Sequence, residues 1–142
     1  MNGYRIVEAH MGRLIGHIMS SPGPDTNGHQ TATCTSAHEP PSPECRCGVH
    51  YVTDPAILVR HIASDDLWQR RAVILEGHPT GGTLPDAVVP QWAEHGVTAA
   101  SWRAAGFQAT TAYALPENTG AAAAARHHGL PLAPLETLEK TT

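Results

Sequence analysis

The feature that most constrains this chain is a cluster of sulfur and imidazole side chains near its middle. All three cysteines lie in the pattern Cys34-x3-His38-x6-Cys45-x-Cys47. Three thiolates and one imidazole complete the tetrahedral ligand set that zinc takes in structural sites. Soft sulfur ligands select zinc, Cu(I) or iron–sulfur over hard cations, and zinc is the default occupant where thiols stay reduced. The sequence therefore predicts one structural Zn²⁺ held by Cys34, His38, Cys45 and Cys47.

The fourth ligand has an alternative in His50, three residues after Cys47. His38 is preferred, because His50 also fits a strand that leaves the site. The segment around the cysteines is rich in proline and short of apolar residues, so it cannot fold by hydrophobic burial alone. A bound metal would supply its folding energy. Gly48 would let the backbone turn sharply and aim amide groups at thiolate sulfur.

The composition also points to a domain that needs such a staple. The 142 residues fit one domain, and they include only one Phe, three Trp and three Tyr. A core built mostly from Ala, Val, Ile and Leu buries less area per residue, so it gains from a metal. We expect a small α+β, mainly β domain over residues 1–115. From Pro116 the chain is rich in Ala, Pro and polar residues without a clear period, which predicts a flexible tail over 116–142.

Within the domain, alternating apolar residues predict one or two strands in residues 4–20. Thr53-Asp54-Pro55 is typical of a helix start, and it predicts one short helix over 55–64. Residues 70–77 read as a buried strand, and residues 78–96 as a loop with a short strand or turn at 87–89. Residues 98–115 are expected to form a hairpin broken near Ala105-Gly106, with a helical start as the alternative. A short helix around 121–127 is compatible with the tail.

The charge and the cysteine count limit the partners and the compartment. The net charge is -4, with eight Arg and one Lys, so the chain lacks the basic patch of a duplex-DNA binder. An odd number of cysteines argues against a closed disulfide framework. No apolar run reaches the length of a signal peptide or of the roughly 18 residues that span a membrane. The sequence predicts a cytoplasmic protein without a membrane partner.

These observations favour a non-enzymatic, zinc-stabilised binding or regulatory module that contacts another protein. The charge is negative, the ligand set is closed, and no acid/base group converges on it, so no catalytic residue is predicted. A zinc-finger-like nucleic-acid-binding protein is the first alternative. A small metal- or cysteine-dependent enzyme is the second, because Arg46 between two cysteines would help to lower a thiol pKa. Three thiolates would make the ion a weak Lewis acid, which disfavours the enzyme.

The cysteine segment resembles one found in small proteins of actinobacteria and their phages, A-x-C…H-x-x-P-x-x-x-C-x-C-G-[IV]-x-A. A later strand pair in those proteins, roughly G-x-R-A…A-x-x-x-L, is similar to Trp102-Arg103-Ala104 followed by Ala112 and Leu115. One departure is the run Val49-His50-Tyr51, where those proteins more often have an aliphatic, an aromatic and then a small residue. The other is a longer loop at 78–98. The resemblance implies a metal-stapled, β-containing module carried by a phage or mobile element, and no activity. The matching residues of the cysteine segment are Ala32, Cys34, His38, Pro41, Cys45, Cys47, Gly48 and Val49.

Overall fold

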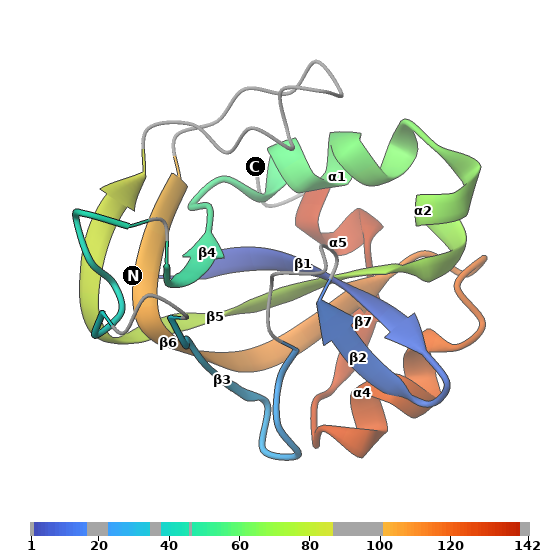
Figure 1. The fold of residues 1–142 in the computed structure, drawn as a ribbon. Coiled ribbons are helices and arrows are strands. Elements are labelled where there is room, and N and C mark those ends of the chain that lie inside the picture. Colours follow the sequence, from blue (N-terminus) through green and yellow to red (C-terminus); the bar gives the residue numbers. More distant parts are fainter. Residues whose placement is uncertain (1, 17–22, 35–37, 46, 87–100, 140–142) are drawn as a thin grey trace.

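The computed structural model describes residues 2–16, 23–34, 38–45, 47–86 and 101–139. The fold is α+β and mainly β, as the sequence predicts, and the described residues form one seven-stranded sheet and four short helices (Figure 1). The strands are β1 (Gly3–His10), β2 (Arg13–Gly16), β3 (His29–Thr31), β4 (Val49–Tyr51), β5 (Ala72–Asp86), β6 (Ser101–Ala114) and β7 (Leu132–Pro134). The helices are α1 (Pro55–Ala63), α2 (Asp66–Arg71), α4 (Ala121–His127) and α5 (Glu136–Glu139).

Strand β6 is the axis of the sheet. On one edge it pairs with β5, from Ser101 to Tyr113. On its other edge it pairs in turn with β4, β3 and β7, the last of them in parallel. Strands β1 and β2 extend the sheet beyond β5. Segments far apart in the sequence therefore meet on one strand.

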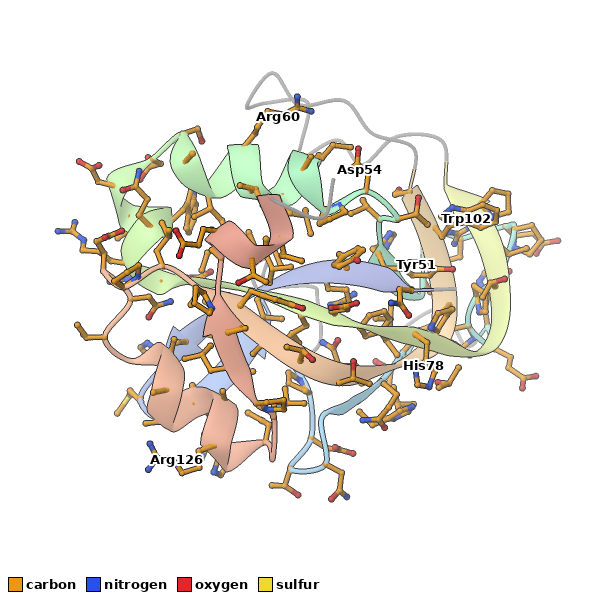
Figure 2. The ribbon with its side chains drawn as sticks, turned by 180° about the vertical axis from the view of Figure 1, so that it is seen from behind. Tyr51, Asp54, Arg60, His78, Trp102 and Arg126 are labelled. Carbon is orange, nitrogen blue, oxygen red and sulfur yellow. The ribbon has the colours of Figure 1, made fainter. Side chains whose placement is uncertain are left out.

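The sheet curls strongly at the end where β5 and β6 meet β4 (Figure 1). Two register shifts mark bulges in this pair: Thr110 is the extra residue of β6 opposite the Glu76–Gly77 step, and β5 has an extra residue between Thr80 and Thr83. A bulge increases the twist and bends its strand. The curl brings the end of β4 to β1, where Tyr4 and Val52 exchange two backbone hydrogen bonds of 2.8 and 3.0 Å. A small core cluster includes Tyr51 (labelled in Figure 2) and Phe107, whose ring centroids are 5.9 Å apart.

The two faces of the sheet carry separate cores, because alternate strand residues point to opposite sides. Helices α1 and α5 cover one face, where Leu58 and Leu138 pack with Ile74. Helix α4 covers the other face, where its buried alanines pack with Val73 and Leu75 (Figure 1). The predicted helix over 55–64 is confirmed as α1: the Asp54 side chain accepts from the Ala56 backbone N–H at 3.0 Å.

The packing of residues 116–139 differs from the expected flexible tail. Helix α4 ends at His127, and Gly129 follows the capping residue with a φ of +68°. The Gly129 amide donates to the Arg126 oxygen, while the Leu130 amide donates to the Ala125 oxygen. This pattern is the Schellman motif, for which glycine is the favoured residue. The chain then pairs as β7 with β6 and ends in α5. The segment thus completes the sheet and both of its faces.

Two further expectations differ from the structure. Residues 78–86, predicted as loop, continue β5, and residues 87–89 lie outside the described residues. Residues 101–114 form one strand and not a broken hairpin. A Cβ at Gly106 would overlap the Thr80 hydroxyl, so this glycine marks a close approach between strands and not a turn. None of the described helices is long and apolar enough to cross a membrane.

Candidate metal centre

The structure brings the four preferred ligands together. Cys34 follows β3 and the other three precede β4, so the segment between two strands that both pair with β6 carries the whole group. One ligand atom from each of the four residues lies within 4.8 Å of the other three, and all four side chains are half-buried. The group comprises Cys34, His38, Cys45 and Cys47.

The separations suit a tetrahedral ion and not a disulfide. The sulfur atoms of Cys34 and Cys45 are 3.6 Å apart. With Zn–S bonds of about 2.3 Å, tetrahedral geometry places two sulfurs about 3.8 Å apart. A disulfide needs about 2.05 Å, and all three cysteines are free. Since all the ligand atoms lie within 4.8 Å of one another, no separation would have to shorten by more than roughly 1 Å when an ion binds.

The imidazole of His38 provides an independent sign of a ligand. Its Nδ1 atom is buried and has no hydrogen-bond partner among the described residues. A buried polar atom without a partner costs free energy, and a metal ion satisfies a ring nitrogen as well as a hydrogen bond does. His50 lies instead on β4, opposite Arg103 of β6, and is not part of the group. The structure therefore favours His38 over His50.

A buried arginine holds the cysteine segment on the sheet. Arg103 lies on β6 with 6% of its surface exposed. Its Nη1 atom donates to the backbone oxygens of Ser42, at 3.1 Å, and Cys47, at 3.0 Å. The same atom also donates to the backbone oxygen of Cys45. Two of the three acceptors thus belong to residues of the metal-binding group.

Gly48 makes the close approach of this segment to β6 feasible. Its φ is +136°, a conformation that side chains rarely adopt. A Cβ on Gly48 would lie 2.9 Å from the Cβ of Arg103 and 3.4 Å from the backbone oxygen of Ala104. The glycine of the C-x-C-G sequence is therefore required both by its backbone angle and by the space available.

The electrostatics of the group favour a bound cation. Burial raises the pKa of the Cys47 thiol, and the neighbouring thiols of Cys34 and Cys45 raise it further, while a hydrogen bond from the Ser42 backbone lowers it. Adjacent thiolates repel one another, so each disfavours the ionisation of the next. A divalent cation reverses this balance, because thiolates coordinated to a metal are deprotonated outright.

The four side chains that lie together are those that the sequence predicted as ligands, whereas the contacts of Arg103 were not predicted. That residue appeared only as part of the resemblance, in Trp102-Arg103-Ala104, without a function. The sequence around Arg103 could have indicated a role for it, because Arg103 is the one charged residue between Ser101 and Ala114. A charge inside a strand of small and apolar residues is typical of a buried group with defined partners.

No protein-family model, curated protein or solved structure matches this chain.

Proposed function

We propose that Cys34, His38, Cys45 and Cys47 bind one zinc ion with a structural role, in a non-enzymatic module that contacts another protein. The main support for the metal site is that four candidate ligand atoms lie within 4.8 Å of one another. Three sulfurs and one nitrogen select a soft or borderline ion, and zinc takes such a set as a closed tetrahedron. Four protein ligands leave no position for a reactive water, which supports a structural ion over a catalytic one.

A structural ion would fix the segment between β3 and β4 on the sheet. In the described part of this segment the backbone makes few internal hydrogen bonds, such as that from the Cys45 amide to the Ser42 oxygen at 3.2 Å. The cluster of apolar residues nearest to it, around Tyr51 and Phe107, belongs mainly to the strands. The free energy that orders the segment would therefore come largely from metal–ligand bonds.

Zinc binding is tested by native mass spectrometry and elemental analysis of the purified chain. We expect one zinc per chain, and chelation should lower the midpoint of thermal unfolding. The matched pair His38→Ala and His50→Ala separates the two candidate ligands, because only the first should reduce metal retention. A stably folded chain without metal, unchanged by added zinc, would contradict the proposal.

A protein partner is supported by apolar side chains that remain at the surface. Met11, at the turn between β1 and β2, is 89% exposed, and Ile15 and Leu132 are also exposed. Burying an exposed apolar side chain against a partner removes it from water, which favours association. The zinc-loaded chain should retain a defined partner in affinity purification, and Met11→Asp should weaken that retention. Equal retention by the wild type and by chelated, unfolded chain would indicate non-specific adsorption and contradict this function.

A nucleic-acid partner receives less support from the charge distribution. Arg5 and Arg103 are buried, so two of the eight arginines cannot neutralise phosphates. Fluorescence anisotropy with labelled DNA and RNA at low salt tests this alternative. Binding that weakens steeply as salt rises would favour it over a protein partner.

A further inference from the structure

We infer that Arg103 is the cationic anchor of the zinc centre: it positions the ligand segment on β6 and offsets the negative charge of the thiolates. This inference rests on the zinc site proposed above. It adds a positioning residue that lies 56 residues from Cys47 in the sequence. Arg103 does not ligate the ion and acts through the backbone of the residues that do.

The positioning role follows from convergence on a single atom. Backbone oxygens of Ser42, Cys45 and Cys47 all accept from Nη1 of Arg103. An Nη1 group has two hydrogens, so three oxygens around it share them in a small cage of carbonyl groups. Such a cage fixes the backbone on both sides of the Cys45-x-Cys47 pair. Two ligands one residue apart can reach one ion only if the backbone between them bends, and the cage holds both ends of that bend.

The charge role follows from the composition of the centre. One zinc ion with three thiolates and a neutral imidazole carries a net charge of about -1. The four ligand residues are half-buried, and Arg103 is more deeply buried than any of them. Charges attract more strongly away from bulk water, so a guanidinium hydrogen-bonded to the ligand segment stabilises the loaded centre. The arginine thereby favours the metal-bound state over the empty one.

Metal competition with matched variants tests the inference. Arg103→Met keeps most of the apolar side chain and removes both the charge and the donors. Arg103→Lys keeps the charge and the donors on a shorter side chain. Arg60→Met is the control, since Arg60 points into solvent from the outer side of α1 (Figure 2). Each chain is titrated with a zinc chelator, and cobalt(II) absorption reports the geometry of the ligand set.

We expect Arg103→Met to weaken zinc binding about 10- to 100-fold, the loss typical of residues that support metal ligands. Arg103→Lys should recover part of that loss, and Arg60→Met should bind as the wild type does. At saturating cobalt(II), Arg103→Met should still give a tetrahedral spectrum, because the ligands are unchanged. A merely structural role for Arg103 would lower thermal stability without separating the lysine variant from the methionine variant in zinc affinity.

The outcomes distinguish this inference from the proposed function. If the wild type binds zinc and Arg103→Met binds it within a factor of two, the inference is wrong and the zinc site stands. If Arg103→Met does not fold, Arg103→Lys decides: a lysine variant that folds and binds zinc within about tenfold of the wild type supports the cationic anchor, and one that folds without binding zinc, or does not fold, overturns it. A wild-type chain that binds no zinc would overturn both.

Discussion

Replacing Gly48 with alanine should weaken zinc binding about 100-fold. The φ of +136° at Gly48 lies in a region that is nearly restricted to glycine, and holding alanine there costs of the order of 1–3 kcal/mol. The added Cβ would also lie 2.9 Å from the Cβ of Arg103. That atom is tied to the backbone of β6, so rotating a side chain cannot relieve the contact. We take about 3 kcal/mol for both effects together.

This cost should appear in metal affinity because the segment takes its folded shape when the ion closes it. Each 1.4 kcal/mol is a factor of about ten in a dissociation constant, so 3 kcal/mol corresponds to roughly 100-fold. Gly82→Ala is the matched control. Its backbone angle is an ordinary one, and the nearest atom to an added Cβ is Cδ of Pro41 at 4.0 Å.

Both variants are measured by titrating the zinc-loaded chain with a chelator, with thermal unfolding in parallel. Gly82→Ala should bind zinc as the wild type does. The reasoning is refuted if Gly48→Ala binds within threefold of the wild type. It is also refuted if the two alanine variants lose the same affinity, because the effect would then not depend on the position.

Two further predictions concern the packing around the sheet. The ring of His128 accepts a hydrogen bond from the Leu14 amide at 2.9 Å. His128→Ala leaves that buried amide unpaired, so it should lower the free energy of unfolding by about 1–3 kcal/mol. The control His127→Ala removes an exposed side chain and should lower it by roughly 0.5 kcal/mol or less. Urea denaturation of both variants checks this, and equal losses would contradict it. The Tyr113 hydroxyl donates a hydrogen bond to the Glu76 carboxylate at 2.6 Å. Tyr113→Phe should therefore lower the free energy of unfolding by about 1–2 kcal/mol at neutral pH. Burial and the Glu76 carboxylate raise the pKa of Tyr113, so its contribution is complete below the unfolded value of about 10 and is lost as the pH rises above it. Urea curves of wild type and variant should therefore stay apart up to about pH 10 and converge as the pH rises further, and a gap that stays constant above about pH 10 would contradict the assignment.

The sequence was most informative where chemistry is local. The spacing of the four candidate ligands, the cap at Asp54 and the strand pattern of β1 each depend on neighbouring residues. The structure brings the four candidate ligands together and contains the capped helix and the strand. The preference for His38 over His50 came from the same local argument. The grouping of these four side chains could therefore be predicted without any knowledge of the sheet.

The C-terminal segment was harder to predict because the buried and the exposed positions of its helix are occupied by the same residue type. Helix α4 buries Ala121, Ala124 and Ala125, which is a helical period, but the exposed positions between them are also alanine. Buried and exposed faces are then indistinguishable in the sequence. The sequence of this segment also does not indicate that β7 pairs with β6. That pairing depends on which part of the β6 edge the other strands leave unpaired.

Long-range contacts explain the remaining differences. Gly106 looked like a break, but its lack of a side chain makes room for Thr80 and His29 from two neighbouring strands. Arg103 looked like an isolated charge, but its acceptors come from residues 42–47. In both cases the partner lies far away in sequence, so neither residue type nor local period identifies it.

The place of β6 in the chain has a consequence for the order of events during synthesis. Every strand that flanks the cysteine segment pairs with β6, yet Cys47 leaves the ribosome 56 residues before Arg103. At about 5–20 residues per second, the thiols are exposed for roughly 3–11 s before their supporting strand exists. At the proposed zinc site, metal acquired in that interval would be held at the affinity of the unsupported segment, and the full affinity would arise only when β6 has been made.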